Sequence, residues 1–520
     1  MTLDSVRHRG TPPNVFVRDH GRWQVSWLAS QCLASPSRLS SGVRCRSAHR
    51  LQLRGQPRIR MNPTAFPFNP DAGTIQTNHA RNAPRSSIRL SFDTHVTPST
   101  AAAYSKRRLA ALRHPGFAGF LAARFLATFE VQMQTVAVGW QVYALRHDPL
   151  DLGLVGLSQF LPFIPLGLVA GHVADRFNRR RILTFCYATQ VLCALLLLAF
   201  TLSGVHVVWP VFAVMGLFGV ARAFSMPASQ AIVPTLVPIE NFGNAVALSS
   251  SSFQVATIAG PTLGGVLYLA GPQTVYGVVA TLLAIACVLM SLAGVRQLNV
   301  AAASQPEGAQ PKATAEISWH GVLEGLRFVR SRPVVLGAIS LDLFAVLLGG
   351  ATALLPAYAR DILHVGPTGL GLLRTAPGVG AALAGLVLAF TPIARHVGRW
   401  MFAGVALFGV ATVVFGLSHV FIVSLAALLF LGIGDMASVY IRHMLVQLDT
   451  PDAIRGRVSA VNGVFVGASN ELGEFESGLT AAWFGLVPAV VIGGIATLLV
   501  AGLWMRWFPA LRTIDRFPGH

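Results

Sequence analysis

Charged residues are scarce in this sequence. Only 12% of its 520 residues are Asp, Glu, Lys or Arg, whereas about a quarter is usual in soluble proteins, and 53% are hydrophobic. The shortage is complete over long stretches, because residues 182–202, 275–295, 400–417 and 487–505 contain no charged side chain. Runs of about 20 apolar residues match the hydrocarbon core of a bilayer. Buried helices of soluble proteins are shorter and rarely recur this often, so the pattern indicates a polytopic membrane protein.

Residues that build metal centres and catalytic motifs are also few. The five cysteines show neither metal-ligand spacing nor a disulfide framework, and His364, His419 and His443 are isolated. There is no P-loop, which argues against an ATP-driven pump, and no HExxH or cofactor motif. We therefore expect no cofactor, no metal and no nucleic-acid partner. A membrane-embedded enzyme with Glu474 and Glu476 as acid and base stays open as an alternative, as does a receptor or scaffold.

Breaks at charged or Gly/Pro-rich loops divide the apolar sequence into twelve spans. They lie near residues 117–145, 152–174, 182–203, 207–233, 243–270, 274–295, 334–358, 366–391, 400–417, 420–446, 458–485 and 487–508. The longest internal hydrophilic stretch separates the first six from the last six. The predicted fold class is all-α integral membrane, with twelve transmembrane helices in two six-helix bundles. The bundles are expected at 104–295 and 334–510, with a cytoplasmic linker at 296–333 and a cytoplasmic tail at 511–520.

A weak repeat relates the two halves. A shift of 215 residues lays GLSQFLP (156–162) on GLLRTAP (371–377). The same shift aligns Gly219 with Gly434 and Ile239 with Ile454. One offset that serves several spans predicts two bundles related by a parallel repeat, as in many transporters.

Basic residues in the short loops predict the orientation in the membrane. One side holds twenty, namely Lys106, Arg107, Arg108, Arg113, Arg176, Arg179, Arg180, Arg181, Arg296, Lys312, Arg327, Arg330, Arg332, Arg395, Arg399, Arg455, Arg457, Arg506, Arg512 and Arg516. The other side holds only Arg146 and Arg360. Because cytoplasmic loops carry the excess of Lys and Arg, both termini are expected to be cytoplasmic in a multi-pass protein of the cell inner membrane.

The first hundred residues do not share the apolar pattern. They contain fourteen arginines and four aspartates, and so supply +10 of the net charge of +19. We expect residues 1–103 to be a disordered basic extension. A transit peptide is a further reading, although Asp4 and Asp19 count against it. Our preferred interpretation is that translation starts further downstream, at Met61 or at a non-Met codon closer to the first span.

The charges inside the spans are unevenly distributed. Spans three, six, nine and twelve have none, and the remaining charged residues are Arg124, Glu130, Arg222, Asp342, Arg374, Asp435, Arg442, Glu471, Glu474 and Glu476. Ionisable side chains within a membrane face the protein interior or a watery cavity. The charge-free spans should therefore face lipid, and spans one, four, seven and ten should line a cavity.

The loop between spans two and three reads GHVADRFNRRR (171–181) and resembles the signature motif of the major facilitator superfamily. Gly171, Asp175, Arg176, Arg179 and Arg180 match the signature, and Asn178 stands where Gly is usual, which suits a left-handed turn. The resemblance implies a cytoplasmic gate that latches the two halves. The alternative is that these arginines only anchor the loop on the cytoplasmic side.

Two further stretches extend the resemblance over residues 110–517. GPTLGG, with Gly260, Pro261, Gly264 and Gly265, is similar to the core of the superfamily's antiporter motif, although plain helix packing explains it equally well. SNELGEFESG (469–478) looks like a branch that includes enterobactin-type exporters. The resemblance implies alternating access and proton-coupled export of a siderophore-like or amphipathic small molecule, by a monomer.

Six ionisable residues are the candidates for proton coupling. Glu130 in span one with Arg222 in span four is the first choice, because the superfamily's proton-driven exporters often carry an acid and an arginine there. The others are Asp342, Asp435, Glu471 and Glu474. Glu471 lies about 18 Å along its helix from Ser459, near mid-bilayer, and shares a face with Glu474. Alternatively these glutamates bridge neighbouring helices by pairing with Arg374 or Arg442.

A shortened chain tests the interpretation of the first hundred residues. A protein that begins at Ala101 should insert and transport like the full-length chain, because the removed part has no apolar periodicity. Membrane insertion and transport in vesicles are the measurements, and failure of the shortened chain to insert would contradict the prediction.

Overall fold

The computed structural model describes residues 16–19, 22–25, 110–292, 319–451 and 454–517, and predictions for other residues lie outside it. The chain divides into two units, Met1–Asp93 and Thr94–His520. In the first unit, strands β1 (Phe16–Asp19) and β2 (Arg22–Val25) pair antiparallel, with Phe16 opposite Val25. These eight residues form a hairpin, and the predicted disorder of the rest of residues 1–103 lies outside the described residues. Their aromatic and β-branched side chains, with a two-residue connection, favour a hairpin.

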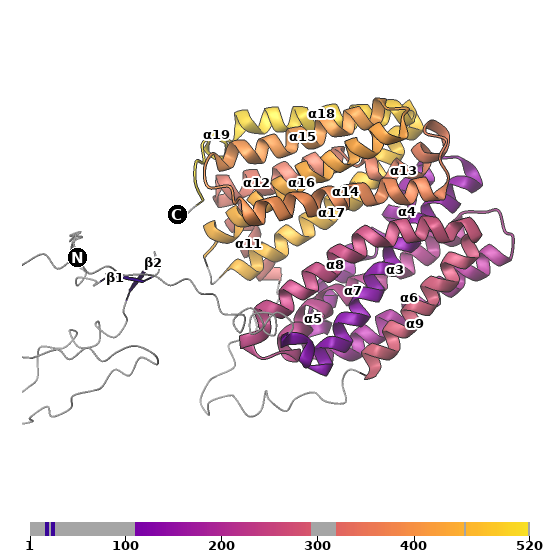
Figure 1. Cartoon of the computed structure of the whole chain (residues 1–520), viewed down its shortest axis with the longest axis horizontal. Coiled ribbons are helices and arrows are strands. Elements are labelled where there is room, and N and C mark those ends of the chain that lie inside the picture. The colour runs from indigo at the N-terminus through magenta and orange to yellow at the C-terminus, as the bar shows by residue number, and fades with distance from the viewer. Residues whose placement is uncertain (1–15, 20–21, 26–109, 293–318, 452–453, 518–520) are drawn as a thin grey trace, which may run out of the picture. The chain divides into compact units, whose positions relative to one another are not determined.

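The second unit begins with six membrane spans that form an N-terminal bundle (Figure 1). A short 3₁₀ turn, η1 (Ala110–Arg113), precedes it. Its helices are α3 (Pro115–Arg146), α4 (Pro149–Phe160) with α5 (Phe163–Arg176), α6 (Arg179–Leu202), α7 (Trp209–Leu236), α8 (Ile239–Leu267) with the 3₁₀ turn η2 (Tyr268–Ala270), and α9 (Pro272–Leu292). Span two is the only one here made of two helices, and Pro162 stands at its break, since proline cannot donate the helical hydrogen bond.

Six further spans form the C-terminal bundle. They are α12 (Pro333–Leu348) continued by η3 (Ala351–Leu354), α13 (Leu355–Ala357) and the π-helical turn η4 (Tyr358–Ile362), then α14 (Pro367–Phe390), α15 (Val397–Leu417), α16 (Phe421–Asp449), α17 (Arg455–Phe484) and α18 (Leu486–Trp507), followed by the short α19 (Pro509–Arg512). The twelve spans in two bundles confirm the predicted fold class. Ten of the described spans are long and apolar enough to cross a membrane by length and composition alone; the more polar α3 and α17 are not among them.

The spans run alternately between two ends of the bundles, which we name by residues. At the Arg146 end, α3 finishes and α4 begins. At the Arg179 end, α5 finishes and α6 begins. The side chain of Arg180 donates to the carbonyl of Met290 at 2.9 Å, which places the start of α6 beside the finish of α9.

The charge-free spans lie on the outside of the bundles, as predicted. Helix α6 packs on α9, and α15 packs on α18. Their outward faces expose large apolar side chains, among them Phe185, at 75% exposure, and Leu499, at 68%. Apolar surface of this extent is stable where it contacts lipid rather than water.

Residues 319–331 form a helix that the sequence prediction assigned to the linker. Helix α11 (Trp319–Ser331) packs against α17 and α12, with Val329 buried among Val335 and Val458. Arg457 donates to Glu324 at 2.5 Å, which fixes the helix to the start of α17. Apolar residues at helical spacing were present in this stretch, so its helical character was readable from the sequence.

The C-terminal segment caps the first turn of α15. The backbone N–H of His396 donates to a carboxylate oxygen of Asp515 at 3.1 Å. The N–H groups of Val397 and Gly398 donate to the carbonyls of Asp515 and Ile514, at 3.3 and 3.0 Å. These donors have no partner within the helix, so the chain terminus satisfies them in place of a local cap.

Loss of the Asp515 side chain should destabilise the C-terminal bundle. Asp515→Ala removes the acceptor and should cost about 1 kcal/mol, the usual worth of a helix N-cap. Asp515→Asn keeps an acceptor oxygen and should retain most of the stability. Thermal unfolding of the purified variants measures both effects, and equal loss in Asn and Ala would refute the capping role.

Candidate functional site

The two bundles meet mainly toward the Arg146 end. Helix α4 packs on α17, and α8 packs on α14. Gly156 and Gly371, which the 215-residue repeat aligns, both lie in these contacts. A Cβ built on Gly371 would lie 2.6 Å from the carbonyl oxygen of Pro261, and one on Gly156 would lie 2.7 Å from Oε2 of Glu474. The repeat therefore places a glycine in the α4–α17 contact and another in the α8–α14 contact, where the helices approach closely.

Hydrogen bonds reinforce the contact between α8 and α14. The hydroxyls of Thr262 and Thr375 are 2.7 Å apart, and Thr375 also donates to the carbonyl of Ile258 at 2.9 Å. The amide of Gln254 donates to the carbonyl of Gly378 at 3.0 Å. This side of the interface is thus joined by direct polar bonds between the bundles.

A further bond crosses the Arg146 end. The hydroxyl of Tyr143, near the end of α3, donates to the carboxylate of Asp361 in η4. Sequence reasoning did not single out either residue. No local pattern marks them, because they lie 218 positions apart and only the docking of the bundles brings them together.

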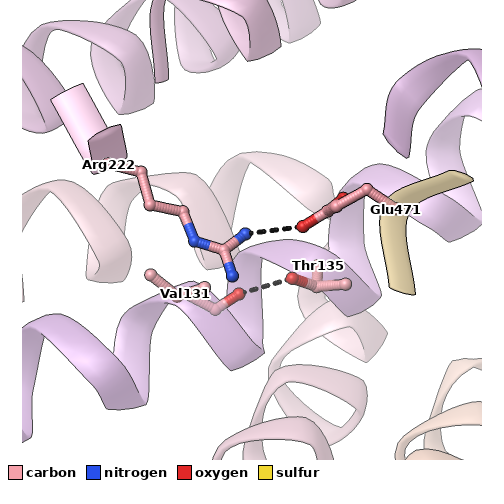
Figure 2. Close-up of polar contacts among 4 residues, drawn as sticks. All are labelled: Val131, Thr135, Arg222 and Glu471. Carbon is pink, nitrogen blue, oxygen red and sulfur yellow. Dashed lines mark hydrogen bonds and ion pairs between the residues drawn. The ribbon is translucent and has the colours of Figure 1, made fainter. Parts of the chain in front are cut away.

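An ion pair joins the bundles near the middle of the spans. Nη1 of Arg222, on α7, lies 3.1 Å from Oε1 of Glu471, on α17. Figure 2 shows the arginine reaching across to Glu471 beside Val131 and Thr135 of α3. The Arg222 side chain is 46% exposed and that of Glu471 is 17% exposed. The guanidinium group of Arg222 is therefore not enclosed by protein on all sides.

A second acid–base set lies next to this pair. Glu474, beside Gly156 of α4, interacts electrostatically with Glu471, Arg374 and Arg222. Nε of Arg374, on α14, is buried and has no hydrogen-bond partner among the described residues. Glu471 therefore bridges two helices through Arg222, whereas the pairing of these glutamates with Arg374 stays a prediction and Arg442 pairs with Asp342.

Glu130 does not lie beside Arg222, and the expected pairing of these two residues is wrong. Its side chain is fully buried, and neither carboxylate oxygen has a hydrogen-bond partner in the described part of the chain. It lies near Tyr187 and Cys193 of α6, within the N-terminal bundle. Arg222 pairs instead with Glu471 of the opposite bundle.

The other acidic candidates lie apart from this site. Asp342 forms a buried ion pair with Arg442, which joins α12 to α16 inside the C-terminal bundle. Asp435 on α16 is half-buried and has no ion-pair partner among the residues that the structure describes. Glu476 accepts a hydrogen bond from the hydroxyl of Thr480 at 2.9 Å, one turn further along α17.

The arginines of the signature motif brace the N-terminal bundle. Arg179 donates to the carbonyls of Ala174 and Ala231, at 3.3 Å each, and Arg180 donates to that of Met290. Arginines suit the carbonyl-rich ends of helices. Gly171 is buried in α5 and Arg176 is exposed at its end, whereas the side chain of Asp175 lies outside the described residues.

Asn178 differs from the expected left-handed turn. Its φ is −62°, and its side chain accepts from the N–H of Arg180 at 3.0 Å. Asn178 is thus the N-cap of α6, a position that favours asparagine for its short acceptor side chain.

The GPTLGG motif lies wholly in helix–helix contacts. Gly260, Pro261, Gly264 and Gly265 are all buried. Gly260 and Gly264 face Gln132 and Met133 of α3, whereas Gly265 faces Pro367 and Gly371 of α14. The motif therefore packs α8 against α3 of its own bundle and against α14 of the other bundle. No group of three or more His, Cys, Asp or Glu among the described side chains is arranged to hold a metal ion.

Known proteins resemble the chain over most of its length. The model of the Major Facilitator Superfamily matches residues 120–474. Enterobactin exporter EntS of Citrobacter koseri is 26% identical over 403 residues, 75% of this chain and 93% of that protein. Multidrug efflux pump Tap of Mycolicibacterium fortuitum is 28% identical over 398 residues, 73% of this chain and 92% of that protein.

Solved transporter structures share the fold. A bacterial homolog of the human lysosomal transporter Spinster superposes with a TM-score of 0.60, at 15% identity, over 78% of this chain and 96% of that one. The nucleoside transporter NupG superposes with a TM-score of 0.56, at 14% identity, over 77% of this chain and 99% of that one.

The close contact at Gly371 can be tested directly. In a cysteine-free background with Thr262→Cys and Thr375→Cys, the two thiols should cross-link readily, because the threonine hydroxyls are in contact. Gly371→Val should sharply reduce the yield, because its side chain would meet the backbone of α8. Gly502→Val is the matched control, since nothing lies within 4 Å of a Cβ there. Full cross-linking in Gly371→Val would contradict the packing described here.

Proposed function

The chain belongs to the major facilitator superfamily, and from this premise we propose that it exports a small molecule in exchange for protons. Membership makes it a multi-pass membrane transporter, and both exporter relatives support the export direction. The substrate is proposed to be siderophore-like or amphipathic, in keeping with the enterobactin and multidrug cargoes in the relatives' names. A membrane-embedded enzyme and a scaffold are the alternatives that the experiment below also tests.

The proposed orientation places the Arg179 end in the cytoplasm. It rests on the excess of arginine and lysine in the loops at that end. The bonds that join the bundles lie toward the opposite, Arg146 end, so the conformation seen here would be closed to the outside. Export then requires that the contacts at Gly156 and Gly371 separate while the cytoplasmic ends approach each other. The arginines of the signature motif are proposed to take part in that second contact.

The ion pair between Arg222 and Glu471 is the observation that carries the proposal. Its two halves belong to different bundles, so any movement of one bundle against the other changes their distance. Arg222 favours the charged form of Glu471 while the pair is intact. When the pair separates, Glu471 loses the positive charge that favoured its charged form, and so it binds a proton more readily. Protonation of Glu471 and the position of the bundles are thereby linked, as an antiporter requires.

Glu471 is a better coupling residue than Glu130 on this geometry. Glu130 has no exposed surface and faces α6 inside one bundle, so its surroundings need not change as the bundles move. We infer that it has a structural role. Glu474 with Arg374 would act as a second carboxylate–arginine set beside Glu471, and the two glutamates share the same face of α17.

The half-exposed guanidinium of Arg222 also suggests how substrate enters the cycle. Its exposed part is free to donate to a further group while it holds Glu471. A substrate with acceptor oxygens could replace Glu471 at Arg222, and the released carboxylate would then take up the proton. Substrate and proton would thus act on the same ion pair.

Two glutamine variants decide between the coupling candidates. The substrate is first identified by a transport screen of siderophores and amphipathic dyes with protein in proteoliposomes under an imposed proton gradient. Glu471→Gln keeps the shape of the side chain but cannot change its charge. It should abolish gradient-driven transport and preserve energy-independent substrate exchange, whereas Glu130→Gln should transport at the rate of the unaltered protein.

Glu476→Gln is the matched control, because it lies on the same helix but bonds only locally to Thr480. Gradient-driven transport that survives in Glu471→Gln and fails in Glu130→Gln would overturn the assignment. If no compound in the screen is moved by the unaltered protein, the enzyme and scaffold alternatives gain instead.

A further inference from the structure

A cavity of about 550 Å³ lies at the Arg179 end of the C-terminal bundle, away from the Arg222 site. It is formed by the first turns of α15, the last turn of α18 and the segment that follows α19. Figure 1 shows these three elements together at one end of the bundle. No step of the proposed transport cycle uses this cavity.

The inner wall of the cavity is apolar. Phe402, Ala403 and Ala406 of α15 line it, with Met505 of α18. These positions of α15 are spaced by about one helical turn, so they form one continuous face. The wall runs along both spans toward the middle of the membrane, where hydrocarbon chains are the available filling.

The rim of the cavity is basic. Arg399 and Arg512 are exposed, and neither takes part in an ion pair with any acid in the described part of the chain. The one acid of the rim, Asp515, has other partners. Its carboxylate lies 3.9 Å from His396 and 3.8 Å from Arg516, and it also accepts from the backbone of α15. The two free guanidinium groups therefore dominate the charge of the opening.

Exposed tryptophans mark the depth of the cavity in the membrane. Trp400 on the first turn of α15 is 55% exposed, and Trp507 at the end of α18 is 62% exposed. Tryptophan collects at the level of the lipid headgroups, because one part of its ring is apolar and the other is a hydrogen-bond donor. Arg399 lies in the same turn as Trp400, and Arg512 ends α19, the short helix that follows Trp507. The rim arginines therefore stand near the headgroup level, with the apolar wall below them.

We propose that this cavity is a binding site for an anionic glycerophospholipid. The phosphate and the rest of the headgroup would lie between Arg399 and Arg512, and an acyl chain would lie against Phe402 and Ala406. The pairing of a basic rim with an apolar wall at headgroup depth matches one amphiphile with a negative head. A soluble anion would make no contact with the apolar wall. The cationic group of a zwitterionic lipid would be repelled by the two guanidinium groups.

The bound lipid would add a contact among three elements that meet at this end. The segment after α19 is held to α15 by the cap at Asp515, and α18 forms the other wall. A lipid between them adds a bridge between the start of α15 and the end of α18. Binding should therefore stabilise the C-terminal bundle, which gives a second measurement besides retention of the lipid.

Native mass spectrometry of the delipidated full-length protein tests the site. Phosphatidylglycerol and phosphatidylcholine with the same acyl chains are offered at equal concentration. The protein should retain phosphatidylglycerol preferentially, and the lipid should raise the unfolding temperature. The double variant Arg399→Gln/Arg512→Gln should bind phosphatidylglycerol about thirtyfold more weakly, since each basic side chain near an anionic headgroup contributes a factor of roughly five.

Two further double variants serve as controls. Arg395→Gln/Arg506→Gln removes two arginines of the same end that do not line the cavity, and should leave binding unchanged. Arg399→Lys/Arg512→Lys keeps the charge and should retain most of the binding, which separates loss of the site from misfolding. Glycerol phosphate is the probe for a soluble anion and should give no shift in unfolding temperature.

Three outcomes would overturn the proposal. Equal retention of the two lipids would show that charge does not select the occupant. Undiminished binding by the glutamine variant would place the lipid elsewhere. A shift with glycerol phosphate equal to that with phosphatidylglycerol would identify a site for soluble anions.

Discussion

Ionisable side chains inside a membrane must be kept away from lipid by the protein, and the arrangement of this transporter depends on that constraint. The chain meets it in three ways. Asp342 and Arg442 pair inside one bundle, and Glu130 is buried without a hydrogen-bond partner among the described residues. Arg222 and Glu471 pair between bundles. Only the third arrangement changes when the bundles move, because each of the others travels with a single rigid unit.

The same interface joins charge to close packing. Glu474 lies against Gly156, at a point where any larger side chain would collide with the carboxylate. Gly371, which the repeat aligns with Gly156, permits a similarly close contact between α8 and α14. The charged side and the hydrogen-bonded side of the interface therefore close together at the Arg146 end. Separation there would expose polar groups on both sides, and water or substrate entering between the bundles is the natural replacement for the lost bonds.

Polar backbone groups at the start of α15 in the C-terminal bundle also need partners within the protein. The first N–H groups of α15 would otherwise be unsatisfied, and the chain terminus supplies their acceptors through Asp515 and Ile514. That tether also shapes the basic, apolar-walled cavity beside Arg399 and Arg512. Backbone satisfaction and the proposed lipid site are thus consequences of one short segment folding back on the bundle.

The sequence by itself determined the number of spans, their bounds to within a few residues, the outer position of the charge-free spans and the family. These depend on hydrophobicity and motifs, which are local properties of the chain. Only the tertiary structure decided that Arg222 pairs with Glu471 rather than Glu130. The two partners lie 249 positions apart, and the rotation of each helix about its axis, together with the docking of one bundle on the other, determines which side chains meet. Composition and residue spacing do not determine the rotation of each helix, whereas packed contacts such as those at Gly156 and Gly371 do.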